Sequence, residues 1–220
     1  MNVGIIGGTG PAGRALALRL ASVGHNVVIG SRDRARSSTA ANELRRSLDE
    51  RSNFLHSGSN NEAALSEIVV LATPWEGAVA TATDLSEPLR EKVLVSMVSA
   101  LARVGDEFQA VISSRGSIAA SLQSVLPETF VTTGFQHVPA RDLAGINKPL
   151  DAHVMICSDS ERGFLETKAL VTSIEGLHAV FCGSLASANA VEALTAVLLN
   201  INVRYKAHVS MRLTGFDENG

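Results

Sequence analysis

Short apolar runs alternate with amphipathic stretches along the first two thirds of the chain. We expect buried strands at residues 3–6, 27–29, 67–72, 92–96 and 130–135. We expect helices at residues 16–23, 38–51, 78–84 and 117–126, the second of them polar. Residues 56–62 show neither pattern and are predicted to form a loop. Strands that alternate with helices favour a parallel, doubly wound α/β sheet.

The segment after residue 148 is too short for a second large domain. It is predicted to hold strands at residues 153–157 and 177–181 and helices at residues 161–174 and 186–201. We therefore expect a first domain of residues 1–148 and a small α/β C-terminal lobe of residues 149–220. The strongly apolar helix at residues 186–201 is a candidate surface for a homodimer.

A glycine-rich turn separates the first predicted strand from the first predicted helix. Gly8, Gly10 and Gly13 form a G-x-G-x-x-G pattern, and a second strand follows within about 30 residues. Glycines at these positions let the backbone turn tightly and approach a pyrophosphate, and the helix N-terminus offers unpaired N–H groups to it. In this context the pattern predicts a dinucleotide-binding domain of the Rossmann type.

The end of the second predicted strand favours NADP over NAD. An NAD site usually places an acidic residue there to bind the ribose hydroxyls, whereas this chain has Ser31 and Arg32, with Arg34 and Arg36 beyond them. Guanidinium groups bind phosphate through two parallel hydrogen bonds. Two other interpretations stay open: Asp33 is a displaced ribose ligand, or the arginines only solvate the start of a helix.

Composition narrows the class of protein. A hydrophobic content of 45% with only 19% charged residues predicts a compact globular chain. The net charge of −3 disfavours a nucleic-acid partner. No apolar stretch approaches the roughly 20 residues of a membrane span, and the chain enters a strand directly without a leader, so we expect a cytoplasmic protein. Cys157 and Cys182 are isolated, and the histidines do not cluster, so no metal site is predicted.

Four segments converge at the carboxyl edge of the predicted sheet, where ligands bind in open α/β folds. They are residues 8–13, 73–76, 97–101 and 136–140. Trp75 either borders the nicotinamide side of this cleft or caps the core, and His137 either contacts a substrate or is structural. No Ser/His/Asp or Cys/His nucleophile set can be assembled. Hydride transfer needs none, because the cofactor supplies the chemistry and the protein supplies alignment.

Several of these segments, in this order, make the chain similar to one known family. The markers are Gly7-Gly8-Thr9-Gly10 with Gly13, Leu16-Ala17-Leu18-Arg19-Leu20-Ala21, Gly24-His25, Gly30-Ser31-Arg32, Thr73-Pro74-Trp75-Glu76, Val138-Pro139-Ala140, Glu192-Ala193-Leu194-Thr195 and Leu199-Asn200-Ile201. Together they resemble the NADPH-dependent reductases of the 8-hydroxy-5-deazaflavin coenzyme F420, and the likeness covers almost the whole chain.

The resemblance implies an oxidoreductase that transfers hydride between NADP(H) and coenzyme F420. It implies that the pyrophosphate is bound by Gly8, Thr9, Gly10, Pro11, Ala12 and Gly13, and the 2′-phosphate by Ser31, Arg32 and Arg36. It further implies that the cofactor cleft is lined by Thr73, Pro74, Ala78 and Ala140. The deazaflavin would lie between this cleft and the C-terminal lobe, with its phosphate and glutamate tail near the basic terminal segment Arg204–Arg212.

The chain departs from the family pattern at one position. The family often carries His three positions before the proline of an H-x-x-P-A stretch, but this chain has Gln136 there and His137 one place later. We assign Gln136 and His137 as the candidate catalytic residues. Their altered order leaves two alternatives open: an NADPH-dependent reductase of another acceptor (a flavin, quinone, ferric chelate or small imine), or a non-catalytic NADP-sensing module.

Overall fold

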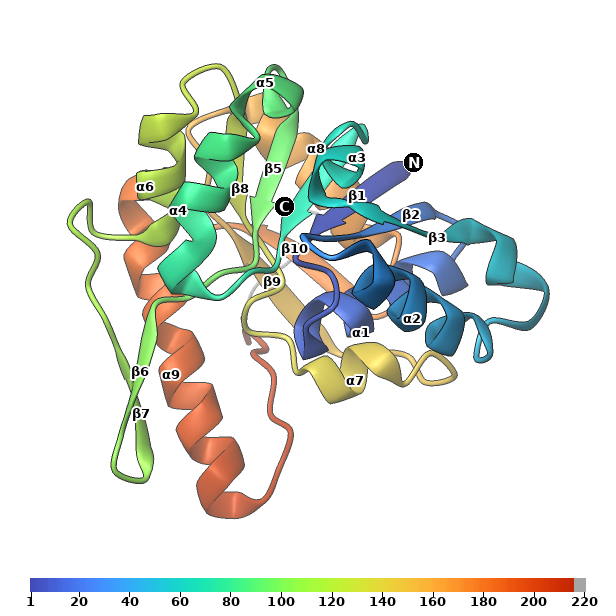
Figure 1. The fold of residues 1–220 in the computed structure, drawn as a ribbon. Helices are drawn as coiled ribbons and strands as arrows, with labels where there is room; N and C mark the ends of the chain where they lie inside the picture. Colours follow the sequence, from blue (N-terminus) through green and yellow to red (C-terminus); the bar gives the residue numbers. More distant parts are fainter. Residues whose placement is uncertain (216–220) are drawn as a thin grey trace.

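The computed structural model describes residues 1–215 and shows a three-layer α/β fold around a parallel sheet (Figure 1). The six strands of this sheet follow the order β3-β2-β1-β4-β5-β8. They are β1 (Asn2–Ile6), β2 (Asn26–Ser31), β3 (Leu55–Ser59), β4 (Ile68–Leu71), β5 (Val93–Ser96) and β8 (Phe130–Thr133). The order reverses between β1 and β4, which confirms the predicted Rossmann-type doubly wound sheet.

Helices cover both faces of the sheet, because successive side chains of a strand point to opposite faces. On β1, Ile5 belongs to one apolar cluster and Ile6 to another. The first cluster is covered by α1 (Pro11–Ser22), α2 (Arg34–Arg45), α7 (Ala140–Ala144) and α8 (Glu161–Thr172). The second is covered by α3 (Asn60–Ala64), α4 (Trp75–Asp84), α5 (Ser86–Leu89), α6 (Ile118–Val125) and the start of α9 (Ala188–Tyr205).

The C-terminal part contains a second, two-stranded parallel sheet of β9 (Ala152–Ile156) and β10 (Leu177–Phe181). It is joined to the edge of the main sheet: Thr133 donates its N–H to Cys157 O (3.0 Å), and Thr133 Oγ1 accepts the Cys157 N–H (2.8 Å). The predicted small α/β lobe is therefore present. Apolar residues of β9, α8 and β10 belong to the first cluster, and those at the start of α9 belong to the second. The core is therefore continuous across the predicted boundary at residue 148 on both faces of the sheet.

The loop predicted over residues 56–62 is wrong. Residues 55–59 form β3, and α3 follows at once. Ser59 and Glu62 form a capping box, in which Ser59 Oγ accepts the Glu62 N–H (3.2 Å) and Glu62 Oε2 accepts the Ser59 N–H (2.7 Å). The polar helix predicted over 38–51 also differs: α2 begins and ends earlier, and a 3₁₀ helix, η1 (Asp49–Phe54), follows it.

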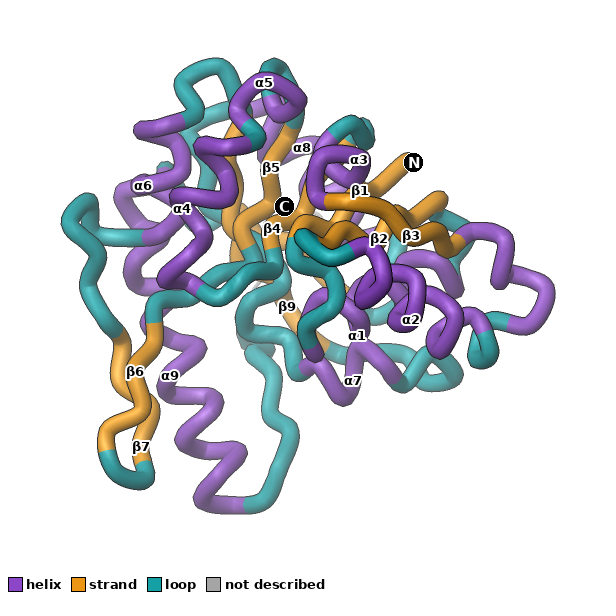
Figure 2. Tube along the Cα trace, in the orientation of Figure 1, coloured by secondary structure: helices purple, strands orange, loops and turns teal. Residues whose placement is uncertain are grey.

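A hairpin that the hydrophobic pattern did not predict lies beside the last helix. Its strands are β6 (Leu101–Val104) and β7 (Glu107–Ala110). The amide of Asn200 on α9 fixes it, since Phe108 N–H donates to Asn200 Oδ1 (2.7 Å) and Asn200 Nδ2 donates to Phe108 O (2.9 Å). We call the hairpin and α9 together the arm. The arm extends from the body of the molecule (Figures 1 and 2).

The expectation that no apolar stretch approaches membrane-span length is also wrong. By length and composition, one helical segment of the described chain could cross a membrane: Leu185–Tyr205, with 21 residues and a mean hydropathy of 1.2. It combines the short 3₁₀ helix η2 (Leu185–Ser187) with α9. Its first half packs on the protein, because the buried Glu192 carboxylate accepts the N–H groups of Ile118 (2.9 Å) and Ala119 (3.0 Å) at the start of α6.

Candidate active site

A cavity of about 580 Å³ lies at the carboxyl ends of β1, β2 and β4, where the strand order reverses. This is the position at which open α/β sheets bind their ligands. Seven of the predicted coenzyme-binding residues line it: Thr9, Gly10, Ser31, Arg32, Arg36, Thr73 and Pro74. The structure thus brings together the glycine turn, the end of β2 and the end of β4.

The three glycines of the turn have different roles. A Cβ on Gly8 would lie 2.9 Å from Ile5 O, and one on Gly13 would lie 2.8 Å from Gly8 Cα, so both positions require glycine for close packing. The Gly8 N–H also donates to Gly30 O (2.9 Å), which fixes the turn to β2. At Gly10 the nearest atom to such a Cβ would be 3.8 Å away. Gly10 therefore faces the cavity, whereas Gly8 and Gly13 shape its wall.

Helix α1 begins at the cavity with a free N-terminus. Gly10 is its N-cap and supplies no side chain to the first-turn N–H groups, and Pro11 occupies the first position. No acidic residue lies in the first turn. The partial positive charge of this 12-residue helix is therefore uncompensated by the protein, as in sites that bind a pyrophosphate. Pro11 and Ala12 lie in this first turn.

The residues at the end of β2 form two groups: some make hydrogen bonds within the protein, and others lie at the cavity without a protein partner. Asp33 caps α2, because its Oδ1 accepts the Ala35 N–H (2.8 Å). Ser31 Oγ accepts the Asp33 N–H (3.2 Å). Arg32 and Arg36 line the cavity, and neither has an ion-pair partner within residues 1–215. This capping hydrogen bond gives Asp33 a structural role, so a role as ribose ligand is not needed to explain it. The exposed guanidinium groups of Arg32 and Arg36 remain at the cavity.

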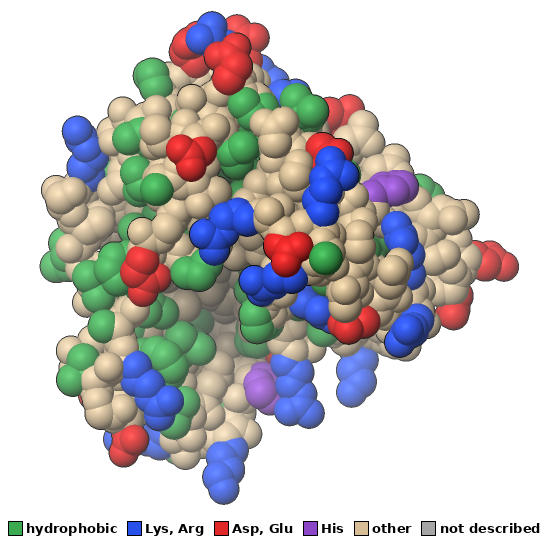
Figure 3. Space-filling model, in the orientation of Figure 1, with side chains coloured by type: hydrophobic (Ala, Val, Ile, Leu, Met, Phe, Trp, Pro, Cys, Tyr) green, Lys and Arg blue, Asp and Glu red, His purple; other side chains and the backbone are tan. Residues whose placement is uncertain are grey.

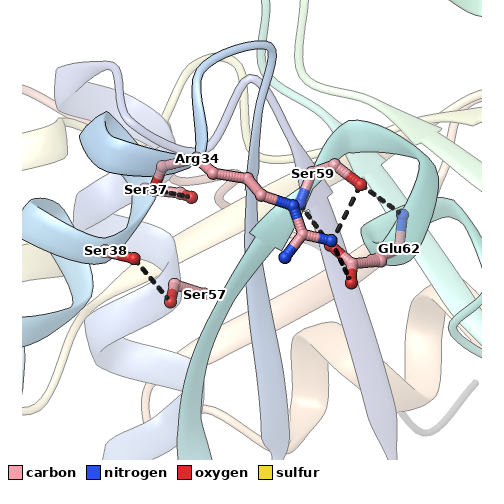
Figure 4. A network of polar contacts seen from close by, with 6 residues as sticks. All are labelled: Arg34, Ser37, Ser38, Ser57, Ser59 and Glu62. Carbon is pink, nitrogen blue, oxygen red and sulfur yellow. Dashed lines mark hydrogen bonds and ion pairs between the residues drawn. The ribbon is translucent and has the colours of Figure 1, made fainter.

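Arg34, which lies between them, is compensated by the protein. Its Nη2 lies 2.6 Å from Glu62 Oε1, and Glu62 is in turn bound to Ser59 (Figure 4). The pKa of Glu62 lies below its usual value, chiefly because the carboxylate accepts the Ser59 backbone N–H, and further through the Ser59 hydroxyl and Arg34. Arg34 therefore differs from Arg32 and Arg36 in having a carboxylate partner.

The segment after β4 divides between cavity and core. Thr73 and Pro74 line the cavity, and Thr73 Oγ1 is a buried hydroxyl that has no hydrogen-bond partner in the described structure. Trp75 donates its Nε1–H to Leu101 O (3.1 Å) at the start of the hairpin and so supports the arm. Its ring packs against the apolar cluster on that face of the sheet, as expected of a residue that caps the core. Ala78 is completely buried in the apolar cluster on that face.

The turn after β8 directs His137 away from this cavity. The strand ends at Thr133, and Phe135 has a left-handed backbone (φ 66°), so the segment is irregular. His137 is 3% exposed, and its Nε2 lies 2.9 Å from His153 O and 3.2 Å from Met155 N on β9. Burial lowers the pKa of His137 to about 4, although the hydrogen bond with His153 O opposes this shift. The imidazole is therefore neutral at neutral pH.

Gln136 and Ala140 flank His137. The side-chain amide of Gln136 is buried, yet neither its oxygen nor its nitrogen has a hydrogen-bond partner among residues 1–215. Such unpaired groups are uncommon in folded proteins and indicate a missing ligand or water. Ala140 begins α7 directly after Pro139. The catalytic assignment of Gln136 and His137 stays a prediction. The two side chains differ in their surroundings: the amide of Gln136 has no hydrogen-bond partner in the described structure, whereas His137 Nε2 is bound to β9.

Comparison with known proteins decides the family. Residues 2–100 match the model of the family described as NADP oxidoreductase coenzyme F420-dependent. The F420-dependent NADP reductase of Methanocaldococcus jannaschii is 31% identical over 223 residues, which cover 99% of this chain and 100% of that protein. The chain belongs to the F420-dependent NADP oxidoreductase family.

Two further members or neighbours agree with this assignment. The F420-dependent NADP reductase of Methanothermobacter thermautotrophicus is 32% identical over 225 residues, covering 99% of this chain and 97% of its own. A crystal structure of a provisionally assigned F420-dependent NADP reductase from Arthrobacter sp. FB24 superposes with a TM-score of 0.83 at 24% identity, covering 97% of this chain and 99% of the other. The latter shows the shared fold. The family resemblance of the sequence motifs is confirmed.

In this member of the F420-dependent NADP oxidoreductase family, several sequence markers have structural roles. Glu192 binds the N-terminus of α6, Asn200 fixes the hairpin, and Ser99 Oγ lies 3.1 Å from Thr195 Oγ1 between the loop after β5 and α9. Burial raises the pKa of Glu192, while its two backbone N–H partners oppose that shift. These markers position the arm against the sheet.

Sequence reasoning missed two residues that shape this family member's site. Asn60 lines the cavity, and its Oδ1 accepts the Gly7 N–H (3.1 Å), so it holds the glycine turn. The Ser59-x-x-Glu62 capping box was the signal that could have placed a helix start, and hence Asn60, at this point. Gly7 itself has a φ of 70°, and a Cβ there would lie 2.7 Å from the Thr73 side chain.

The second such residue is Arg19, which lies within the family marker of residues 16–21 and for which the sequence predicted no role. It is 4% exposed and projects from α1 to the end of α7. Its guanidinium donates to the carbonyl oxygens of Leu143 (2.9 Å), Ile146 (3.4 Å), Lys148 (3.0 Å), Asp142 (2.8 Å) and Gly145 (2.8 Å). Burial lowers the pKa of Arg19, and the charge of Asp142 opposes this. Arg19 thus caps the C-terminus of α7 from a distance.

Proposed function

We propose that this protein transfers hydride between NADP(H) and coenzyme F420, the reaction indicated by the names of its full-length relatives. The observation that carries the proposal is the cavity at the strand-order reversal. There the unpaired Arg32 and Arg36 lie beside a glycine turn and a free helix N-terminus. This arrangement suits a dinucleotide that bears an additional phosphate.

The residues present fit NADP. Arg32 and Arg36 would bind the 2′-phosphate together with the Ser31 hydroxyl, while the turn at Gly10 and the first turn of α1 would bind the pyrophosphate. The unpaired Thr73 hydroxyl offers one more polar contact in the same cavity. When bound, the two coenzymes supply the hydride donor and acceptor. The protein's contribution is to bind, orient and shield them from water.

A hollow beside the arm is the proposed position of the deazaflavin. Figure 3 shows this hollow between the arm and the surface formed by α1 and α7, with apolar side chains toward the arm and cationic side chains at the opposite rim. We assign Gln136 as a contact to the coenzymes, because its amide has both a donor and an acceptor unpaired. His137 supports the turn through its Nε2, which is bound to β9, while its buried Nδ1 has no hydrogen-bond partner in the described structure and is available to the coenzymes.

The reaction itself is the test. Mixing the protein with NADPH and oxidised coenzyme F420 should bleach the deazaflavin absorbance as hydride is transferred. Parallel assays with a flavin, a quinone, a ferric chelate and a small imine test the alternative acceptors that the order of Gln136 and His137 leaves open. Bleaching of F420 with little turnover of the others supports the proposal. Turnover of another acceptor without bleaching of F420 would replace it, and NADPH binding without any hydride transfer would favour the sensing module.

We also propose that the protein is a cytoplasmic homodimer whose interface includes the arm. Exposed apolar side chains gather there: Val104 is 54% exposed, Val197 52%, Val203 54% and Tyr205 71%. Large exposed apolar surfaces commonly mark interfaces. Sedimentation of the purified protein should show a dimer, and Val197→Glu with Val203→Glu should shift it to a monomer. A species that is monomeric at all concentrations would contradict the interface, and cell fractionation tests the compartment.

A further inference from the structure

Asn60 lines the coenzyme cavity with only half of its side-chain amide bonded to the protein. It follows the Ser59 cap as the first residue of α3 and is 9% exposed. Its Oδ1 accepts the Gly7 N–H (3.1 Å), and because an amide nitrogen cannot accept, this contact decides which way the amide is turned. The Nδ2 of Asn60 therefore points away from the glycine turn.

This Nδ2 is an unused hydrogen-bond donor. It donates to no residue of the described chain. It is not fully enclosed either, since the enclosed side-chain atoms without a partner are Thr73 Oγ1, His137 Nδ1 and the amide of Gln136. The part of Asn60 that stays open faces the cavity. An amide donor on a side chain that is otherwise buried requires a partner from a ligand or from solvent.

The packing of α3 on the sheet holds Asn60 in place. A Cβ on Gly4 of β1 would overlap Ala63 O, and one on Gly30 of β2 would lie 2.8 Å from Ala63 Cβ and 3.0 Å from Asn60 Oδ1. Glycines on two strands thus allow the close approach of this helix, and the capping box fixes its start. A side chain held in this way loses little conformational freedom when a ligand binds.

The neighbours of Asn60 belong to the two parts of the proposed coenzyme site. Gly7 is part of the glycine turn, which is proposed to bind the pyrophosphate, and Gly30 directly precedes the residues proposed for the 2′-phosphate. In NADP(H) the adenosine ribose joins these two phosphate groups. A donor that lies between the two parts of the site therefore faces the oxygen atoms of this ribose.

We propose that Asn60 is a coenzyme-binding residue, whose Nδ2 donates to an oxygen of the adenosine ribose while its Oδ1 holds the glycine turn. This inference rests on the proposed function, because it adds a contact to the same coenzyme. One rigid amide would then bind both the turn and the ribose. NADPH and NADH share the 3′-hydroxyl of this ribose, so the contact would add affinity for both and would not distinguish them.

The experiment uses a variant that removes the donor and keeps the acceptor. Asn60→Asp retains an oxygen for the Gly7 N–H, and a carboxylate in the first turn of a helix is favourable, so the fold should be preserved. The matched control is Asn61→Asp, which adds the same charge to the next residue of α3, where the side chain is exposed and does not line the cavity. Urea unfolding verifies that both variants are folded.

Fluorescence titrations with NADPH and NADH measure the effect at low salt and in about 1 M salt, where the screening length is roughly 3 Å. Asn60→Asp should weaken the binding of both nucleotides about tenfold relative to the unmodified protein. The factor should persist in high salt, because salt screens the field of a carboxylate but does not restore a lost hydrogen bond. Asn61→Asp should weaken binding less than about twofold at low salt and not at all in high salt.

A second measurement observes the amide of Asn60 in the unmodified protein and so does not depend on the stability of a variant. In NMR spectra of protein with ¹⁵N-labelled asparagine, the Asn60 side-chain signal is identified by its proximity to the Gly7 N–H. Saturation with NADPH should slow the exchange of its hydrogens with solvent, because one of them becomes hydrogen-bonded. The exposed amide of Asn61 should exchange at an unchanged rate.

The outcomes separate this inference from the proposed function. Unchanged NADPH affinity in Asn60→Asp, a loss that disappears in high salt, or an Asn60 amide whose exchange NADPH leaves unchanged overturns the contact alone. A loss confined to NADPH overturns the assignment to the ribose. Failure of the unmodified protein to bind NADPH overturns the proposed function and the contact with it. A loss for both nucleotides that persists in salt and is absent in Asn61→Asp supports the contact.

Discussion

The turn after β1 and the turn after β8 lie at the same edge of the sheet but are determined in different ways. In the first, Gly8, Gly10 and Gly13 shape the backbone, and its partners at the end of β2 follow within thirty residues. In the second, His137 takes its direction from the backbone of β9, and the following helix is capped by Arg19. The first is a local site and the second depends on contacts between distant segments.

The conformation of the first turn can be specified by a sequence motif, whereas that of the second is specified only by tertiary packing. A close backbone approach requires glycine whatever surrounds it, so the requirement is visible in the sequence. The side chain of a residue in an irregular turn follows whichever partner the fold supplies. At Phe135 the left-handed backbone breaks the alternation of the strand, so the face occupied by Gln136 or His137 cannot be inferred from position alone.

The largest expected effect concerns the distant support of the second turn. Arg19→Met should leave five carbonyl oxygens without their shared donor, and we expect a loss of roughly 3 to 5 kcal/mol in the free energy of unfolding. The control is Arg14→Met on the same helix, whose exposed ion pair with Glu43 (2.5 Å) should be worth less than about 1 kcal/mol. Urea unfolding measures both, and similar losses would show that α7 does not depend on Arg19.

The next effect is a pH dependence centred on His137. Its folded-state pKa of about 4 lies below the ordinary 6.5, so the unfolded chain binds the proton more readily. Stability is then complete above pH 6.5 and is lost as the pH falls toward 4. The loss is about 1.4 kcal/mol per pH unit, or roughly 3 kcal/mol in all.

His137→Gln should flatten this profile between pH 4.5 and 6.5 in denaturant titrations. Burial also lowers the pKa of His25, with the N-terminal ammonium contributing, so a smaller slope should remain. His25→Gln is the matched variant, and it should remove that smaller slope alone. An unchanged profile in His137→Gln would mean that His137 is not the buried neutral group described.

A smaller effect tests the local site. Arg32→Ala should weaken NADPH binding about tenfold, which corresponds to roughly 1.4 kcal/mol and reflects the loss of one charged contact with phosphate. NADH lacks the 2′-phosphate, so its weaker binding should be almost unaffected. Titration of both nucleotides by fluorescence distinguishes the cases. Equal weakening of NADPH and NADH would remove Arg32 from the phosphate site.

The smallest effect is expected at Arg34, which serves as the comparison for Arg32. Its charge is already paired with Glu62 at an exposed position, so Arg34→Ala should change NADPH affinity less than about twofold and stability by less than about 1 kcal/mol. The same titrations apply. An effect as large as that of Arg32→Ala would show that the ion pair opens to admit the phosphate.

Local hydrophobic patterns in the sequence were sufficient to predict most of the strands of the main sheet. The short apolar runs identified β1, β2, β4, β5 and β8, because buried parallel strands are apolar on both faces. The same reasoning failed for β3, whose residues Leu55–Ser59 include His56, Ser57 and Gly58 and so lack a continuous apolar run. It also failed for the hairpin, whose exposed strands are stabilised by Asn200, about ninety residues away in the chain.

The candidate site follows the same division. Ser31, Arg32 and Thr73 could be placed at one cavity from the sequence, because each lies at or just beyond the carboxyl end of a parallel strand. The capping box marks a helix start at Asn60, but the roles of Asn60 and Arg19 could not be assigned from the sequence, because they lie in the partners that the two side chains reach across the fold. The burial of Ala78 could likewise not be predicted, since a small residue near the start of a helix can face either the cavity or the core.

The five-residue helix α3 has a consequence for attempts to change coenzyme preference. Its first turn holds the glycine turn through Asn60 and Gly7, and it holds Arg34 through Glu62. The glycine turn and the start of α2, the two parts of the proposed coenzyme site, therefore both contact one short element. Redesign of residues 32–36 toward NAD should keep Ser59 and Asn60 unchanged, since Asn60 holds the glycine turn and Ser59 caps the helix that carries Asn60.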